Sequence, residues 1–275
     1  MPKVISLPRM QRLLWFLSHP KLYPELFRRL QRNIYLLIAP ALATHTQEAR
    51  AKAKQEATSW CEQHAVDTKT ALQKLVGLTT FDAFDKKFET YLKAADEIIK
   101  TCPVQMGGGG NLDLAYQLAE FCQATRVIET GVSYGWSSLA FLLSLKGREG
   151  SLLISTDLPY IFKDSEKYVG CVVPSELTQY WKILPFSDRE ALPKALEVLP
   201  TIDVCHYDSD KSYEGRMWAY PKLWGALRSG GFFISDDVDD DFGFRDFCNS
   251  IGQIPLIVKT PTESGAKYVG VLVKP

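Results

Sequence analysis

The chain has 275 residues, a length that fits one α/β domain carrying an extension. Its residues are 46% hydrophobic and 23% charged, which is the composition of an ordinary globular protein and excludes a disordered chain. The 32 basic residues balance the 32 acidic ones, so the net charge gives no reason to expect nucleic acid as a partner.

The N-terminal segment has a different charge from the rest of the chain. Residues 1–50 hold eight Lys or Arg and two Glu, a net charge of +6, together with many Leu and aromatic residues. Basic amphipathic helices of this kind bind anionic surfaces or self-associate, and the alternative is a helix packed within the chain. We therefore expect a homodimer or a peripheral membrane contact. The apolar runs at 13–17 and 35–43 are too short for a signal peptide or a membrane span.

The cysteines predict a cytoplasmic protein with reduced, buried thiols. They occur singly, with no CxxC pair and no histidine at metal-ligand spacing. They are Cys61, Cys102, Cys122, Cys171, Cys205 and Cys248.

The first hundred residues show helical spacing of apolar positions. The expected helices include residues 24–37, 46–64 and 81–100, separated only by short turn signals. We predict a helical N-terminal extension over residues 1–101 and a main domain over residues 102–275.

From residue 126 onward, short apolar runs alternate with amphipathic segments. This alternation predicts a parallel sheet covered by helices on both faces, and the last two runs read as an antiparallel hairpin. The expected strands are 126–130, 152–156, 181–186, 202–207, 232–235, 254–259 and 267–273, and the expected helices include 136–145, 189–199 and 213–228.

A glycine turn follows the first of these strands, in the run Glu129-Thr-Gly-Val-Ser-Tyr-Gly135. Ligands of open α/β sheets bind at the carboxyl ends of the strands, where glycines let the backbone come close. Gly131 and Gly135 are therefore the expected floor of a cofactor site. A dinucleotide turn would have the pattern GxGxxG, but Ser133 and Trp136 occupy its second and third glycine positions, which argues against NAD.

Asp157 stands where the next strand ends. An acidic residue at this point of a βαβ unit is placed to hydrogen-bond a ribose diol. The alternative for Asp157 is the cap of a helix.

With these residues in view, the chain resembles class I S-adenosylmethionine (SAM)-dependent methyltransferases over residues 105–275. Further support comes from the segments beginning at Asp203 and at Leu227, the latter reading Leu-Arg-Ser-Gly-Gly-Phe-Phe-Ile-Ser-Asp-Asp. The resemblance implies a doubly wound, mostly parallel, seven-stranded sheet ending in an antiparallel hairpin. It also implies cofactor-binding residues: Met106 and Gly107 in a glycine run that closes over SAM, Glu129, Gly131, Ser133 and Gly135 at its methionine end, Asp157 at the ribose, Ser187 and Asp188 at the adenine, and Asp208.

Carboxylates at the ends of two later strands form a candidate metal site. Asp208 ends one strand, and Asp236 and Asp237 end the next, so the three side chains are expected to converge beside the cofactor. Three carboxylates suit a hard cation such as Mg²⁺. The alternative is a solvated acidic loop running on to Asp241.

The run Asp208-Ser-Asp-Lys-Ser-Tyr213 resembles the DxDKxxY segment of cation-dependent O-methyltransferases of the catechol and caffeoyl-CoA type. Their next strand ends in Asp-Asn, whereas this chain has Asp236-Asp237. The run 212–215 is similar to a second group of methyltransferases with a DHSYEG-like segment. The likeness implies that Mg²⁺ lowers the pKa of an acceptor hydroxyl while Lys211 takes its proton or holds the oxygen, with Asp208 as the second catalytic residue.

The sequence thus predicts an enzyme that transfers a methyl group from SAM to a hydroxyl of a small molecule with the help of Mg²⁺. One alternative is a metal-independent methyltransferase of a sugar or natural product, with an aspartate or His206 as the base. His206 lies within a strand, so we interpret it first as a packed core residue. A third possibility is a regulatory protein that binds SAM at a membrane surface without turnover.

Overall fold

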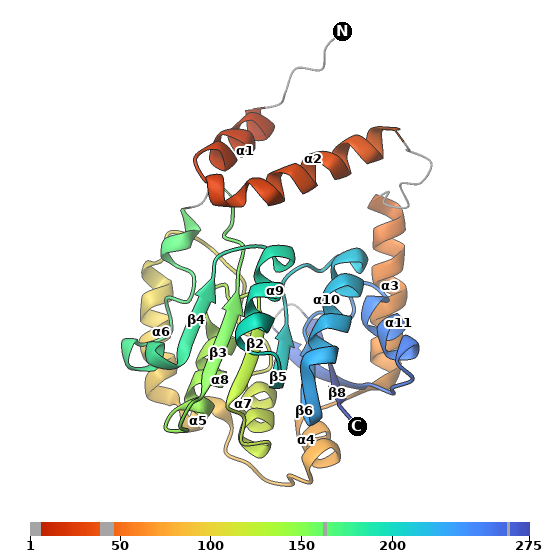
Figure 1. Ribbon diagram of the computed structural model, residues 1–275. Helices are drawn as coiled ribbons and strands as arrows, with labels where there is room; N and C mark the ends of the chain where they lie inside the picture. Colours follow the sequence, from red (N-terminus) through yellow and green to blue (C-terminus); the bar gives the residue numbers. More distant parts are fainter. Residues whose placement is uncertain (1–6, 39–46, 162–163, 263–264) are drawn as a thin grey trace.

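The computed structural model describes residues 7–38, 47–161, 164–262 and 265–275. Within them, one sheet has the strand order β1-β7-β8-β6-β5-β2-β3-β4, and helices surround it (Figure 1). Neighbouring strands are parallel except where β8 pairs with β6 and β7. The strands are β1 (Ala65–Val66), β2 (Arg126–Thr130), β3 (Leu152–Thr156), β4 (Trp181–Leu184), β5 (Ile202–Tyr207), β6 (Leu227–Ser235), β7 (Leu256–Thr262) and β8 (Gly265–Val273).

Helices are present at the expected positions 24–37, 46–64, 136–145, 189–199 and 213–228, with bounds that differ by at most two residues. The helix expected over residues 81–100 is interrupted at Phe88, whose φ of −119° and ψ of 30° leave the helical region. The helices are α1 (Leu7–Leu17), α2 (Tyr23–Ile38), α3 (Gln47–His64), α4 (Thr68–Val76), α5 (Phe84–Lys87), α6 (Glu89–Thr101), α7 (Leu112–Phe121), α8 (Trp136–Leu145), α9 (Asp188–Val198), α10 (Tyr213–Ala226) and α11 (Gly243–Ser250).

The predicted doubly wound sheet with a terminal antiparallel hairpin is confirmed, and it has one strand more than the seven expected. The additional strand β1 pairs in parallel with β7, with Ala65 opposite Ile257. A strand of two residues is too short to show an alternating pattern in the sequence. Ala71 and Leu72 of α4 are also fully buried in the main core. Residues 65–76 therefore pack with the main domain, while the division of the chain at residue 101 stays a prediction.

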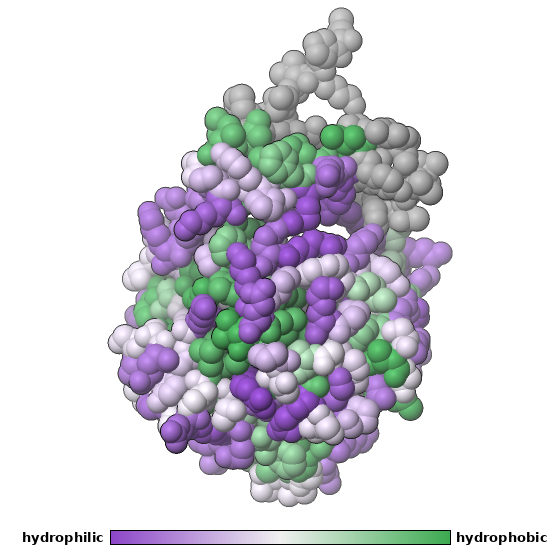
Figure 2. Space-filling model, in the orientation of Figure 1, coloured by the Kyte–Doolittle hydropathy of each residue, from purple (hydrophilic) through white to green (hydrophobic). Residues whose placement is uncertain are grey.

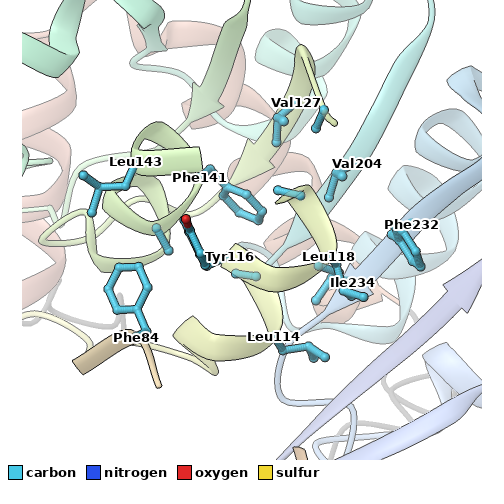
Figure 3. Packing of buried hydrophobic residues seen from close by; sticks show 14 of the residues in the cluster. Phe84, Leu114, Tyr116, Leu118, Val127, Phe141, Leu143, Val204, Phe232 and Ile234 are labelled. Carbon is cyan, nitrogen blue, oxygen red and sulfur yellow. The ribbon is translucent and has the colours of Figure 1, made fainter. Parts of the chain in front are cut away.

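The sheet separates two hydrophobic clusters because adjacent residues of a strand point to opposite faces. Val127 and Val204 belong to the cluster packed against α7 and α8, and Ile128 and Cys205 belong to the cluster under α9, α10 and α11. Figure 3 shows the first cluster, with Phe141 directed toward the strand residues. Burial on both faces explains why the adjacent residues Val127-Ile128 and Val204-Cys205 are all apolar.

Asp203 ties three strands together at the amino-terminal edge of the sheet. Its Oδ2 accepts hydrogen bonds from the backbone N–H groups of Thr125 (2.9 Å) and Arg126 (2.8 Å). Its Oδ1 lies 2.7 Å from Nε of Arg228 and 3.1 Å from the Arg126 guanidinium. Burial alone would raise the pKa of Asp203, but these hydrogen bonds outweigh it and lower the pKa to about 2.

We expect Asp203→Asn to lower the free energy of unfolding at neutral pH by about 2 kcal/mol. The carboxylate stabilises the folded state fully above its unfolded pKa of roughly 3.9, and this contribution is lost as the pH falls through about 2. Urea denaturation at several acidic pH values should therefore show a steeper loss of stability in the wild type than in the variant. Asp96→Asn, at an exposed position of α6, is the control. Parallel pH profiles for wild type and Asp203→Asn would contradict this account.

Candidate active site

The register of the sheet brings the predicted site residues to one edge. Thr130 of β2 lies opposite Tyr207 of β5, and Tyr207 lies opposite Ser235 of β6. The residues that follow these three are Gly131, Asp208 and Asp236. They consequently leave neighbouring parallel strands side by side at the carboxyl edge, where open α/β sheets bind their ligands.

The glycine turn has the backbone conformation that its glycines predict. Gly131 and Gly135 have φ values of 82° and 98°, in the left-handed region that favours glycine. A Cβ at Gly131 would lie 2.3 Å from the backbone oxygen of Asp208. A Cβ at Gly135 would lie 2.9 Å from Cα of Gly170. Both glycines therefore permit close contacts between segments of the chain. Their contact with the cofactor stays a prediction.

Asp157 folds back onto this turn. Its Oδ2 accepts hydrogen bonds from the backbone N–H groups of Val132 (2.7 Å) and Ser133 (2.8 Å). Burial raises the pKa of Asp157 even though these hydrogen bonds oppose the shift. The carboxylate thus fixes the turn between β2 and α8, and its ribose contact remains a prediction.

A cavity of about 240 Å³ opens beside Asp157. It is lined by Asp157, Pro159, Glu166, Val169, Ile183 and Pro185. Val169, Ile183 and Pro185 were not predicted as site residues, because apolar residues near strand ends carry no chemical signature in the sequence. Their apolar faces suit a flat heterocycle, and Asp157 suits the hydroxyls attached to it.

The predicted adenine neighbours Ser187 and Asp188 are not among the residues lining this cavity. Asp188 instead accepts a hydrogen bond of 2.5 Å from Ser209 Oγ and lies 3.4 Å from Thr156 Oγ1. Ser187 Oγ accepts a hydrogen bond of 2.9 Å from Arg28 of the N-terminal extension. Ser187 and Asp188 thus bind neighbouring segments of the chain, and their contact with adenine stays a prediction.

The glycine run before α7 crosses the site. Ser133 Oγ donates a hydrogen bond to the carbonyl oxygen of Gly107 at 3.0 Å, and the N–H of Met106 donates to Tyr134 at 3.1 Å. At its other end, a Cβ at Gly110 would lie 2.3 Å from Oδ2 of Asp236. The run therefore passes from the glycine turn to the acidic strand end, and a side chain at Gly110 would require Asp236 to shift.

His206 lies buried between two carboxylates under the site. Its Nδ1 is 3.8 Å from Oε1 of Glu129, and its Nε2 is 3.4 Å from Oδ1 of Asp236. Burial would lower the pKa of His206, but Asp236 and Glu129 outweigh it and raise the pKa to about 10. His206 is thus a buried residue, as first interpreted, and it carries a positive charge at neutral pH. A protonated imidazole cannot act as the base.

Glu129 also accepts hydrogen bonds from three serine side chains. Their donors are the hydroxyls of Ser137 (2.6 Å), Ser138 (2.5 Å) and Ser155 (2.6 Å). The fully buried Glu129 is therefore satisfied by its neighbours, which is the condition for burying a carboxylate.

A second group of charges surrounds Lys211, which follows the end of β5. Its ammonium lies 3.0 Å from Oδ1 of Asp208 and hydrogen-bonds Oδ2 of Asp237. Burial would lower the pKa of Lys211, but the two carboxylates raise it above its usual range. Burial and the neighbouring Asp236 raise the pKa of Asp208 to about 6, although Lys211 opposes the shift. Burial would raise the pKa of Asp237, but the positive charge of Lys211 outweighs burial and lowers the pKa.

Arg216 of α10 supports this group from below and was missed in the sequence. Its side chain is fully buried, and it donates a hydrogen bond of 2.7 Å to the backbone oxygen of Asp237. Asp237 has a φ of 50°, an uncommon conformation for a residue other than glycine. Arg216 therefore holds the strained residue that contacts Lys211. Nothing in the sequence distinguishes a buried arginine from an exposed one on such a helix.

The three carboxylates do not form the predicted metal site in this arrangement. Among the residues that the structure describes, no group of three or more His, Cys, Asp or Glu side chains is placed to hold a metal ion. The ammonium of Lys211 lies between Asp208 and Asp237, while Asp236 faces His206. A cation bound by all three would have to displace both partners, so the donor set as it stands does not fit Mg²⁺.

Comparison with known proteins indicates the class of this domain. Residues 128–238 match a family model described as a methyltransferase domain. A search of the curated proteins finds no match to the chain.

The chain is also similar to several solved structures. They include an O-methyltransferase from Bacillus cereus in complex with SAH (15% identity, TM-score 0.53, covering 78% of this chain and 100% of that one). A putative O-methyltransferase from Klebsiella pneumoniae has 15% identity and a TM-score of 0.52, with the same coverage of 78% and 100%. An O-methyltransferase from Streptomyces achromogenes, involved in tomaymycin synthesis and bound to SAM, has 17% identity and a TM-score of 0.50 over 78% of this chain and 98% of that one. At identities this low, the structural similarity establishes the fold alone.

The strand order, the glycine turn at the end of β2 and the family match define a class I SAM-dependent methyltransferase domain. The match to the methyltransferase domain model runs from β2 to just past β6, over residues 128–238. The prediction of a methyltransferase enzyme is thereby confirmed.

The buried His206 yields a prediction about pH. Because its pKa is raised, its ion pairs stabilise the folded protein fully below the unfolded pKa of roughly 6.5 and are lost as the pH rises through about 10. We expect His206→Leu to lower the free energy of unfolding by roughly 3–5 kcal/mol at neutral pH, because it leaves two buried carboxylates without their cation. Chemical denaturation from neutral to alkaline pH measures both effects.

The control for this prediction is His64→Gln, which changes an exposed histidine. The variant at His206 should also lose the wild-type decline in stability with rising pH. A decline that persists in His206→Leu would assign it to other groups.

Proposed function

We propose that this domain transfers the methyl group of SAM to a hydroxyl of a small-molecule acceptor. The observation that carries the proposal is the charged group of Asp208, Lys211 and Asp237, which adjoins the glycine turn through the contact of Gly131 with Asp208. Two of the similar structures support it, since they are O-methyltransferases in complex with SAH and with SAM.

In this proposal the cofactor lies along the glycine turn. The adenine occupies the cavity beside Ile183 and Pro185, and Asp157 holds the ribose. The methionine end follows Gly131 and Ser133 toward Asp208, and the run from Met106 covers it. This course directs the sulfonium toward the group around Lys211.

The chemistry requires little more than positioning and one proton acceptor. The acceptor oxygen attacks the methyl carbon in line, the bond from sulfur to methyl breaks, and its electron pair stays on sulfur to give SAH. We assign Asp208 as the group that takes the hydroxyl proton, because a base with a pKa near neutral is effective at neutral pH. Lys211 remains protonated, so it holds the acceptor oxygen by a hydrogen bond and cannot take the proton.

Mg²⁺ assistance remains a prediction of the sequence that this donor geometry does not support. The lysine ammonium already supplies a positive charge between Asp208 and Asp237. We therefore favour the metal-independent alternative, with an aspartate as the base. Turnover that survives exhaustive EDTA treatment is the expected result. Loss in EDTA and recovery with Mg²⁺ would show that the carboxylates rearrange around a metal.

SAM and SAH should each raise the melting temperature by several degrees at saturating concentration, and NAD should not, because only a ligand that binds the native state stabilises it. Gly131→Ala should weaken SAM binding by tenfold or more, since its Cβ would displace the backbone at Asp208. Gly225→Ala is the matched control because a Cβ there meets no atom within 4 Å. Calorimetric titration measures the affinities, and SAH release from a panel of phenols, catechols and glycosides measures turnover.

Two outcomes would contradict the proposal. Equal stabilisation by NAD would remove SAM as the cofactor. SAM binding without turnover on any hydroxyl acceptor would favour the regulatory alternative.

The pH profile tests the roles of Asp208 and Lys211. The rate should fall as the pH drops through about 6, because Asp208 then becomes protonated. Lys211→Met should move this fall to higher pH, since removing a neighbouring positive charge raises the pKa of the carboxylate. Asp208→Asn should lower kcat by roughly 10²- to 10⁴-fold, the usual contribution of a positioned base.

The control is Asp240→Asn, because Asp240 belongs to the same acidic loop but pairs with Lys54 at 2.6 Å. It should leave both the rate and the profile nearly unchanged. An unshifted acid limb in Lys211→Met would show that another group titrates near pH 6.

A further inference from the structure

The helices α1 and α2 lie across the edge of the domain that holds the candidate site (Figure 1). Arg28 of α2 forms an ion pair with Glu190 at the start of α9 and hydrogen-bonds Ser187. His19, between the two helices, lies 3.2 Å from Glu166, which lines the cavity beside Asp157. These contacts fix which side of the helix pair faces the domain.

The side of α2 that faces the domain is its charged side. Glu25 accepts hydrogen bonds of 2.6 Å from both Arg28 and Arg29, so these residues share one face of the helix. The apolar residues Phe27, Leu30 and Ile34 lie on the opposite face at helical spacing, and they are 59%, 42% and 54% exposed. A helix on the surface of a globular protein normally has the reverse orientation, with its apolar face toward the core.

Helix α1 extends this apolar surface. Its Leu13, Leu14 and Leu17 are 41%, 57% and 53% exposed. Figure 2 shows hydrophobic residues gathered at the end of the molecule where Figure 1 places α1 and α2. Six large apolar side chains exposed on two short helices form a patch of the kind that marks an interaction site.

The positive charge of this helix pair favours an anionic partner. Residues 7–38 contain six Lys or Arg and one Glu, a net charge of +5. Arg12, Lys21 and Arg32 are exposed. A second copy of the chain docked on the same face would bring two such positive surfaces together, whereas an anionic lipid surface would neutralise them. Within the described residues, no helix is long and apolar enough to cross a membrane, so the contact would be peripheral.

We propose that α1 and α2 dock on an anionic membrane surface, with the apolar face formed by Leu13, Leu14, Leu17, Phe27, Leu30 and Ile34 inserted at the lipid interface. The exposed basic side chains contact the headgroups. The carboxyl edge of the sheet then lies next to the membrane through the contacts of Arg28 and His19. This inference concerns the surface of the helix pair and does not rest on the proposed function.

Co-sedimentation of the full chain with vesicles tests the proposal. The probes are vesicles of phosphatidylcholine alone and of phosphatidylcholine mixed with phosphatidylglycerol. The wild type should bind the anionic vesicles more strongly, and added salt should weaken this binding. Phe27→Gln combined with Leu30→Gln should weaken binding by tenfold or more, because two apolar side chains no longer enter the interface.

Phe121→Gln combined with Ile254→Gln is the matched control, since these apolar residues are also exposed (59% and 95%) but lie outside the helix pair. This control should bind like the wild type. Arg32→Gln should weaken binding to the anionic vesicles roughly fivefold and leave binding to neutral vesicles unchanged. An unchanged melting temperature and an unchanged response to SAM show that each variant is folded, independently of any membrane contact.

Three results would overturn the proposal. The first is equal binding of the wild type to neutral and anionic vesicles. The second is equal binding of the wild type and the variant at Phe27 and Leu30. The third is an absence of vesicle binding together with a dimer in light scattering that the same variant dissociates, because a second copy would then cover this face.

Discussion

The close approach of Gly131 to the backbone of Asp208 is the constraint on which the rest of the site depends. It lets β2 and β5 end side by side, so that the proposed cofactor turn and the acidic strand end share one edge. A side chain at this point would have to separate the two strand ends. The same parallel arrangement places Asp236 next to Asp208, since β6 follows β5 in the sheet.

Alternating charges then connect the two ends of the site. Under the sheet edge, Glu129, His206 and Asp236 form a buried series of negative, positive and negative groups. In a second series, Lys211 lies between Asp208 and Asp237, just as His206 lies between Glu129 and Asp236. Each cation offsets two carboxylates that would otherwise repel each other, which explains how so many acids fit at one edge. The pKa of Asp208 is raised because burial and the neighbouring Asp236 outweigh the positive charges of Lys211 and His206.

The sequence predicted the central strands well, because their short β-branched or apolar runs alternate with amphipathic helical segments. Strands β2, β3 and β5 have the expected bounds, whereas β6 begins earlier than expected, at Leu227, through a segment with two glycines. The glycine turn and the acidic strand ends were also foreseen, since strand order alone brings them together. The partner of each charged side chain was not foreseen. Whether Lys211 or a metal ion lies between Asp208 and Asp237 depends on side-chain packing, which the sequence pattern does not reveal. The burial of Arg216 depends on the same packing.

The N-terminal helices show a further limit of pattern reasoning. Periodicity predicted that the helix at 24–37 has an apolar face and a charged face, but periodicity carries no information on which face meets the domain. That orientation follows from partners distant in the sequence, such as Glu190 for Arg28. Because α9 presents an acidic residue there, the charged face of α2 turns inward and its apolar face turns outward. The contacts of Arg28 and His19 with distant segments thus leave the apolar face of an amphipathic helix exposed.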